Sequence, residues 1–305
     1  MTQTAPIPPS SIAYLGPVGT YGEQASRRLA ALAAAPEAEL LPQISIRNVV
    51  LALLAGRCGA AVVPVENSVE GGVSTCLDVL WESSLGQQDP LWIERSLVLP
   101  IRHALLSDGE LPEISEVLSH PQALGQCSLW LQEHLPAALQ LPTSSTAEAA
   151  RLVKGSRFRA AIASVPAGRE HGLPVRAYPI NDQPGNCTRF LLLRRGPALV
   201  GSGNSSGGNS GSGDCTSLAF SLRGNVPGGL MQALQVFASR QLNMSRIESR
   251  PSKRELGEYV FFVDLETAGQ GQLLTEALAA LAPLCEHLAC FGSYPITDDT
   301  VELCS

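Results

Sequence analysis

Short apolar runs alternate with segments of helical spacing along residues 12–195. The runs at 12–15, 58–63 and 159–164 have the length of buried strands, and a polar turn follows each of them. Beyond each turn, apolar residues recur every three or four positions, which is typical of an amphipathic helix. This alternation predicts an α/β fold with a mostly parallel sheet, whose ligands lie beyond the carboxyl ends of the strands.

Residues 196–214 break this pattern, because Gly, Ser and Asn dominate the segment and leave little to pack in a core. We expect a flexible Gly/Ser linker here, between a first domain at 11–195 and a second at 215–305. The second domain has the order strand, helix, strand, strand, helix, strand, at 216–222, 228–242, 244–250, 257–266, 270–284 and 287–294. This order predicts a ferredoxin-like fold.

Composition narrows the class of protein. Charged residues make up 16% of the chain and the net charge is -7, which predicts a globular protein and argues against nucleic acid as a partner. No apolar run has the roughly 20 residues that span a bilayer, and residues 1–11 lack the features of a secretory signal. The 8 cysteines and 5 histidines lack metal-ligand spacing, which predicts free thiols, a cytoplasmic protein and no metal site.

Polar residues follow several of the expected strands. The turn Gly16–Tyr21 precedes a helix whose N-terminal N–H groups can bind an anion, although an ordinary strand–helix turn fits equally well. Its glycines match no dinucleotide or Walker pattern, so no nucleotide cofactor is expected. Residues 64–72 bring a carboxylate, an amide and a hydroxyl together, and Thr143–Thr146 cap a further helix. His120 is interpreted as a turn residue, with catalysis as the alternative.

The stretch at 184–193 is a turn that leads into a buried strand. A Pro-Gly pair opens it, and an apolar run closes it. In an extended chain Thr188 and Phe190 share one face, and Arg189 points to the other. A hydroxyl beside an aromatic ring at the mouth of a strand can meet a ligand, but an ordinary strand start fits the same pattern.

Together these segments resemble the prephenate dehydratases that carry a C-terminal ACT regulatory domain. Short motifs stand in the family's order at Gly16–Thr20, Pro64–Gly71, His120–Leu124, Ser145–Ala147, Ala161–Ser164 and Asn186–Phe190. Two more, at Asn225–Leu230 and Glu248–Pro251, look like the family's phenylalanine-binding motifs.

The resemblance implies a catalytic domain of two α/β lobes, similar to periplasmic binding proteins, with the substrate in the cleft between them. The first lobe would comprise residues 11–90 and 180–195, and the second would comprise residues 91–179. A ferredoxin-like ACT domain would follow at 215–305.

The activity implied is the loss of carbon dioxide and water from prephenate to give phenylpyruvate, without a cofactor. Thr188 matches the family's essential threonine and would donate a hydrogen bond to the departing ring hydroxyl, because its own acidity is too weak for full proton transfer. Phe190 would pack against the ring, and Glu66 would be structural. Helix N-termini would hold the carboxylates. The expected substrate-binding residues are Thr20, Asn67, Ser68, Gly71, Gln122, Ser145, Thr146, Asn186, Arg189 and Phe190.

The resemblance also implies that L-phenylalanine binds the second domain as an allosteric inhibitor, between paired ACT domains of a homodimer or homotetramer. The expected residues are Asn225, Pro227, Gly228, Gly229, Leu230, Glu248, Ser249, Arg250 and Pro251. Gly229 stands where the family usually has alanine, and Gly22 stands where it usually has serine.

Two alternatives stay open at this point. Arogenate dehydratases perform the same chemistry on the aminated substrate, and the motifs do not separate the two activities. A non-enzymatic sensor would join a two-lobed binding domain to an amino-acid-binding module, yet the chain has no DNA-binding motif or basic patch to give it an output. The intact Asn-x-Thr-Arg-Phe run favours an enzyme.

Overall fold

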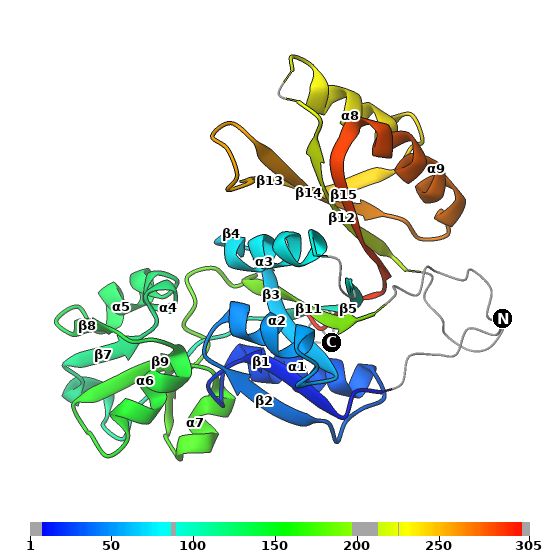
Figure 1. Ribbon diagram of the computed structural model, residues 1–305. Coiled ribbons are helices and arrows are strands. Elements are labelled where there is room, and N and C mark those ends of the chain that lie inside the picture. Colours follow the sequence, from blue (N-terminus) through cyan, green and yellow to red (C-terminus); the bar gives the residue numbers. More distant parts are fainter. Residues whose placement is uncertain (1–7, 87–89, 197–212, 225, 301–305) are drawn as a thin grey trace.

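Three sheets organise the molecule, as seen in a computed structural model that describes residues 8–86, 90–196, 213–224 and 226–300. In Figure 1 the blue lobe and the green lobe stand side by side, and a third unit, coloured yellow to red, lies above the blue lobe. Nearly all of the expected linker at 196–214, and the expected ligand residue Asn225, lie outside the described residues.

The first lobe contains a mixed sheet in which strands from distant parts of the chain lie side by side. Its order is β16, β5, β11, β3, β1 and β2, and β4 pairs with β3. β1 is parallel to β2 and β3, whereas β11 is antiparallel to β3 and β5. The elements are β1 (Ser11–Leu15), α1 (Tyr21–Leu32), β2 (Glu39–Gln43), α2 (Ile46–Leu54), β3 (Ala60–Asn67), β4 (Gly71–Gly72), α3 (Ser74–Ser84), β5 (Leu91–Pro100), β11 (Cys187–Arg195) and β16 (Ile296–Asp298).

The second lobe has a smaller sheet in the order β10, β6, β9, β7 and β8. Its elements are β6 (Ala104–Leu106), a 3-10 turn (Leu111–Glu113), β7 (Glu116–Ser119), α4 (Pro121–Gly125), α5 (Ser128–His134), β8 (Leu139–Pro142), α6 (Thr146–Val153), β9 (Arg159–Ala163), α7 (Val165–His171) and β10 (Val175–Ala177). The helical segment after β7 is interrupted at Gln126–Cys127 and forms two helices, α4 and α5.

The third unit confirms the expected ferredoxin-like order. Its antiparallel sheet runs β13, β14, β12, β15. The elements are β12 (Cys215–Leu222), α8 (Gly229–Ala238), β13 (Asn243–Pro251), β14 (Tyr259–Glu266), α9 (Gly271–Leu281), a 3-10 turn (Ala282–Leu284) and β15 (Cys285–Tyr294). Phe220 and Phe237 belong to the core under α8 and α9. On the other face of the sheet, Phe262 and Phe291 share a core with Trp81 of α3, so the third unit packs on the first lobe.

Two of the expected boundaries are wrong. Residues 91–100 were assigned to the second lobe, but β5 pairs with β11 from Leu91 to Pro100 and therefore belongs to the first lobe. The C-terminal unit was expected to extend to residue 305, but Ile296–Asp298 leaves it and pairs in parallel with β5. Both corrections have one cause, because backbone hydrogen bonds to strands far away in the sequence decide where these segments lie.

The helices α1 and α6 begin at the space between the lobes, and a side chain caps the N-terminus of each. Thr20 Oγ1 accepts the N–H of Glu23 at the start of α1, at 3.3 Å. Ser145 Oγ accepts the N–H of Glu148 at the start of α6, at 3.0 Å. Each cap satisfies an N–H group that the helix itself leaves unpaired. The helix starts of both lobes are therefore fixed at the edges of the cleft.

Candidate active site

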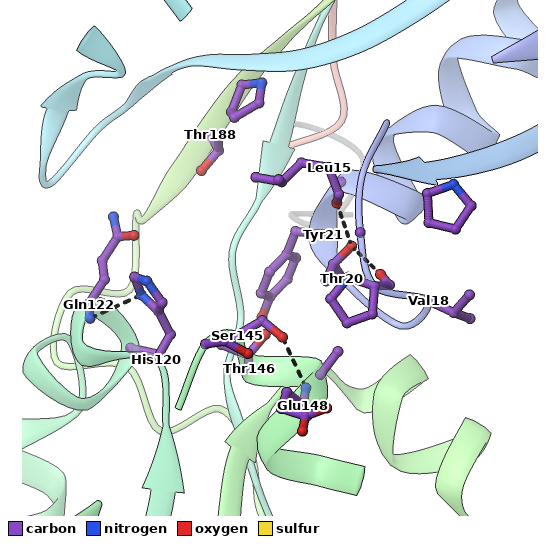
Figure 2. A pocket seen from close by; sticks show the side chains of 18 of the residues that line it. Leu15, Val18, Thr20, Tyr21, His120, Gln122, Ser145, Thr146, Glu148 and Thr188 are labelled. Atoms are coloured by element: carbon purple, nitrogen blue, oxygen red, sulfur yellow. Dashed lines mark hydrogen bonds between the residues drawn. The ribbon is translucent and has the colours of Figure 1, made fainter. Parts of the chain in front are cut away.

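A cavity of about 1050 Å³ lies between the two lobes. The first lobe contributes the turn after β1, the turn after β2, the end of β3 and the start of β11. The second lobe contributes the starts of α4 and α6. Figure 2 shows Thr188, Thr20 and Tyr21 of the first lobe around a common space with Gln122 and Ser145 of the second. The cavity thus lies where ligands of α/β sheets are expected.

Asn67 fixes the hydroxyl of Thr188 at the wall of this cavity. The two residues face each other across the β3–β11 pair. Oδ1 of Asn67 accepts the backbone N–H groups of Val69 and Glu70, each at 3.0 Å, so its Nδ2 must face the other way. That Nδ2 donates to Thr188 Oγ1 at 2.9 Å. Because Oγ1 accepts this bond, the hydroxyl proton of Thr188 remains available to a ligand.

The polar contacts continue from Asn67 into the second lobe. Asn67 Nδ2 also donates to Asn186 Oδ1 at 2.9 Å, and Asn186 Nδ2 donates to Gln126 Oε1 at 2.8 Å. Since Gln126 Oε1 is an acceptor, the Nε2 atom of His103, 3.2 Å away, carries a proton and donates to it. All of these side chains are buried, so the chain orients its members in a low-dielectric interior.

His103 and Tyr21 complete this chain without ionising near neutral pH. Burial is the main cause that lowers the pKa of His103 to about 4, and the hydrogen bond to Gln126 opposes it. Burial also raises the pKa of Tyr21 well above its ordinary value. The Tyr21 hydroxyl donates to the carbonyl of Arg102 at 2.7 Å and lies 3.2 Å from His103 Nδ1. Both rings therefore hold the geometry of the cavity as neutral groups.

The second lobe supplies the polar rim. Ser145 and Thr146 line the cavity at the N-terminus of α6, where backbone N–H groups attract anions. Arg151, one turn further along α6, is the only Lys or Arg that lines the cavity among the described residues. Its guanidinium pairs with Glu148 at 2.6 Å. The start of α6 and Arg151 are thus the positive features that an anionic ligand meets, and Arg151 shares its charge with Glu148, which also lines the cavity.

The expected substrate-binding residues divide into two groups. Ser68, Gly71 and Asn186 do not line the cavity: Ser68 Oγ accepts the N–H of Cys187 at 3.0 Å, and Gly71 pairs with Asn67 in the β3–β4 hairpin. They hold the loop that carries Asn67. The expected residues that line the cavity are Thr20, Asn67, Gln122, Ser145, Thr146 and Phe190, together with the expected catalytic residue Thr188.

Arg189 does not belong with the substrate-binding residues where it was expected. Strand alternation turns it away from the cavity, toward the third unit of the fold, where it pairs with the buried Asp264. Glu66, its partner across the strand pair, lies 3.3 Å from the same guanidinium. These two carboxylates neutralise Arg189, so its charge serves the contact between domains and not the cavity.

The start of α1 carries a negative charge of its own. Glu23 Oε2 accepts the N–H of Gly19 at 2.6 Å, and Arg27 pairs with the same carboxylate at 2.6 Å. The turn at Gly19–Thr20 was expected to hold a substrate carboxylate, but Glu23 already occupies this helix N-terminus. The start of α6 is the better candidate for that role.

His120 has a structural contact and also lines the cavity. It caps α4, and its Nδ1 accepts the N–H of Gln122 at 3.3 Å. Gln126, His103 and Arg151 are part of the site but are not among the residues expected from the sequence. No sequence motif marks these three residues, because each has the residue type that its helix or loop would have without a functional role. Only the fold brings them to the cleft.

The residues expected to bind phenylalanine lie at the start of α8 and on β13. Gly228 caps α8 with a φ of +80°, a conformation that favours glycine. On β13, Glu248 pairs with Arg246 at 2.6 Å, and Arg250 pairs with Asp78 of α3 at 3.2 Å. β13 is an edge strand of its sheet, and the pair between Arg250 and Asp78 joins this strand to the first lobe.

Among the described residues, no helix is long and apolar enough to cross a membrane. No group of three or more His, Cys, Asp and Glu side chains in the same residues has an arrangement that could hold a metal ion.

The fold and the cavity define a class: a two-lobed α/β domain with a ligand cleft, joined to a ferredoxin-like regulatory module. Comparison with known proteins makes this specific. The family model for prephenate dehydratase matches residues 12–198, and the model for the ACT domain matches residues 216–283. The chain therefore belongs to the prephenate dehydratase family of lyases and carries an ACT domain.

Two individual relatives agree with this assignment, and a third has another description. A prephenate dehydratase from Amycolatopsis methanolica is 37% identical over 95% of this chain and 90% of its own. The crystal structure of a prephenate dehydratase from Arthrobacter aurescens in complex with L-Phe matches with a TM-score of 0.81 and 35% identity, covering 93% of this chain and 90% of that one. A structure described as a novel type of quorum-quenching acylase matches with a TM-score of 0.78 and 28% identity, covering 94% and 98%.

Proposed function

We propose that this protein converts prephenate to phenylpyruvate in the cavity between its lobes. One observation carries the proposal: the chain is a member of the prephenate dehydratase family, and Thr188, in the family's threonine position, faces the cavity with its hydroxyl proton free. Asn67 donates to Thr188 Oγ1, so the threonine acts as a donor to whatever binds.

The reaction needs a donor at the leaving hydroxyl. The ring carboxylate leaves as carbon dioxide, and the electron pair of the broken C–C bond enters the ring. The C–O bond on the opposite side of the ring then breaks, and the departing hydroxide takes a proton to become water. Thr188 stabilises that oxygen by a hydrogen bond in the transition state, and solvent supplies the net proton. Phe190, on the same face of β11, packs against the ring as it becomes aromatic.

The two carboxylates of prephenate need positive partners. The N-terminal N–H groups of α6 provide one of them on the second lobe, and the guanidinium of Arg151, shared with Glu148, provides the other. Gln126 provides a further donor, because its Nε2 has no hydrogen-bond partner among the described residues. Prephenate would thus lie with its ring toward Thr188 and its charges toward the second lobe.

L-Phenylalanine is the proposed allosteric inhibitor, bound near α8 and β13 where two ACT domains meet. The Arthrobacter aurescens relative was crystallised with L-Phe. Exposed apolar side chains gather on these elements, with Met231 on α8 70% exposed and Ile247 on β13 46% exposed. An open strand edge beside apolar side chains is suited to pairing with a second copy, which supports a homodimer or homotetramer.

The thiols fit a reducing compartment. All the described cysteines are free, and most are buried. We therefore place the enzyme in the cytoplasm.

The test is to incubate the purified protein with prephenate and to follow phenylpyruvate by its absorbance. We expect turnover with prephenate, slower turnover when arogenate replaces it, and inhibition when L-phenylalanine is added. Faster turnover with arogenate would reassign the substrate, and no product from either compound would contradict the proposal.

A second candidate activity is hydrolysis of N-acyl amides, which the acylase relative suggests. One observation favours it. Val18 and Ile44 on the first-lobe side of the cavity are 45% and 91% exposed, and such exposed apolar side chains suit contact with an acyl chain. Water would add to the acyl carbon, and the C–N bond would break to give an acid and an amine. Release of the free amine from a long-chain N-acyl homoserine lactone tests this activity, and its absence would exclude it.

A further inference from the structure

The strand pair that carries Thr188 has a second polar pair on its opposite face. Across β3 and β11, Thr188 is in register with Asn67, and Arg189 is in register with Glu66. The first pair lines the cavity, whereas the second pair faces the ACT domain. Because these residues are neighbours in the chain, whatever holds Arg189 also holds the backbone of Thr188.

Asp264 of the ACT domain is the residue that holds Arg189. It lies on β14, its side chain is 5% exposed, and its Oδ2 pairs with Nη2 of Arg189. Its other oxygen, Oδ1, accepts a hydrogen bond from Ser217 of β12 at 2.5 Å. Ser217 in turn contacts the buried hydroxyl of Tyr294 at 2.6 Å. The carboxylate is thus fixed from two neighbouring strands before it meets Arg189.

A second arginine completes the cluster from the ACT side. Arg246 of β13 lies 3.8 Å from Asp264 and 3.8 Å from Glu66, and pairs with Glu248 at 2.6 Å. The side chains of Arg189 and Arg246 are 13% and 10% exposed. Water therefore screens these charges little. Their interaction energy rises sharply when the charged groups move apart, so the cluster holds one geometry.

The strand pair that carries Thr188 has a bulge beside this anchor. The register of β11 against β3 shifts between Arg189 and Phe190 because Val65 is an extra residue in β3, whereas β5 pairs with β11 without a shift from Cys187 to Leu192. A bulge lets its own strand bend, so the directions of Glu66 and Asn67 in β3 depend on contacts outside the sheet. Glu66 contacts Arg189, which Asp264 holds, and Asn67 donates to the Thr188 hydroxyl.

We propose that Asp264 is a positioning residue for the dehydration step, so that the ACT domain completes the active-site strand through Arg189. The proposal rests on the function proposed above for Thr188. Loss of the Asp264 carboxylate should displace the Thr188 hydroxyl. Because that hydroxyl acts on the leaving oxygen in the transition state, kcat should fall while substrate binding by the second lobe persists.

The kinetic test compares Asp264→Asn with Asp78→Asn. Asp78 is a matched control, since it also joins the two domains by an ion pair, with Arg250, but lies on α3 away from β11. We expect Asp264→Asn to lower kcat at least about tenfold with KM within about twofold, and Asp78→Asn to change neither by more than about twofold. Equal kcat for Asp264→Asn and the wild type would overturn the proposal.

The double variant Arg189→Met/Asp264→Asn separates positioning from stability. It removes both charges of the pair, so it should recover the urea midpoint that Asp264→Asn loses by leaving the mostly buried Arg189 with only the more distant carboxylate of Glu66. Under the proposal its kcat stays low. Recovery of kcat together with the midpoint would show that the ion pair serves stability alone, and would overturn the proposal.

An activity-independent readout separates this inference from the proposed function. The γ-methyl resonance of Thr188, identified by its loss in Thr188→Ser, should shift in Asp264→Asn and stay in place in Asp78→Asn. An unmoved resonance in Asp264→Asn contradicts the inference whatever the enzyme's substrate. Absence of phenylpyruvate from the wild type, with a shifted resonance, contradicts only the proposed function.

Discussion

The orientation of one amide decides what the Thr188 hydroxyl can do. The two backbone N–H groups that bind Asn67 Oδ1 leave only Nδ2 to face Thr188. A reversed amide would make Thr188 the donor within the protein and would occupy its proton. The hairpin after β3 therefore sets the polarity of the candidate catalytic group, through a contact that lies outside the cavity.

Residue-scale electrostatics predict a pH dependence of stability from His103. Burial lowers its pKa to about 4 in the folded state, whereas the unfolded chain has a value near 6.5. Between these values the unfolded state binds a proton that the folded state does not, so the free energy of unfolding decreases as the pH falls. Integration gives a loss of about 3 kcal/mol at most, complete near pH 4.

His103→Gln should remove this contribution. The measurement is the free energy of unfolding in urea at about pH 7.5 and about pH 4.5, for the wild type and the variant. The difference between the two pH values should be smaller in the variant, even if the variant is less stable at both. Identical differences would show that His103 is exposed enough to titrate normally.

The faces on which the side chains of a strand lie could be predicted from the sequence. The residues that these side chains contact could not. The spacing of Thr188, Arg189 and Phe190 predicted which two share a face, and the cavity lies on that face. The partner of Arg189 is Asp264, 75 residues further along the chain. No periodicity links two such positions, because an ion pair between domains depends on how two finished surfaces meet.

At the scale of elements, short strands were easier to predict than their places in a sheet. Strand-forming residues concentrate at 93–106, but composition does not decide with which lobe they pair, and the register of β5 with β11 assigns β5 to the first lobe. Ile296–Asp298 is harder still, because three residues carry no pattern, and only the open edge of β5 makes them a strand. Pairing partners are a property of the assembled sheet.

A residue of the edge strand β13 tests the proposed regulation by L-phenylalanine. Arg250 belongs to the expected phenylalanine-binding motif and also pairs with Asp78 of the first lobe. Arg250→Ala should raise the L-phenylalanine concentration for half inhibition at least about tenfold, since it removes a charge-assisted contact from the proposed site. The check is inhibition of prephenate turnover, with Glu286→Gln as a control that breaks an exposed ion pair with Arg254 elsewhere in the ACT domain.

The same experiment has a clear negative result. An unchanged inhibition curve for Arg250→Ala would remove this arginine from the regulatory site. A shift of the same size in Glu286→Gln would mean that the effect reflects general weakening of the ACT domain and not a specific contact.

At the scale of the whole molecule, the ACT domain is part of the catalytic lobe's structure. The face of its sheet opposite α8 and α9 shares a hydrophobic core with α3, and the chain after β15 returns to the edge of the catalytic sheet as β16 (Figure 1). Asp299 then pairs with Arg28 of α1, whose first turn lines the cavity. A change in the ACT domain can therefore reach the catalytic lobe through the core that it shares with α3. It can also reach this lobe through β16 and the ion pair between Asp299 and Arg28.

The central claim is that Thr188 carries the chemistry of a prephenate dehydratase, and turnover by its variants tests this most directly. The measurement is the rate of phenylpyruvate formation at saturating prephenate for the wild type, Thr188→Ser and Thr188→Ala, with urea midpoints to establish folding. We predict that Thr188→Ala loses at least about a hundredfold in kcat while it keeps its fold, and that Thr188→Ser retains a measurable part of the activity. Near-normal turnover by a folded Thr188→Ala would contradict the account.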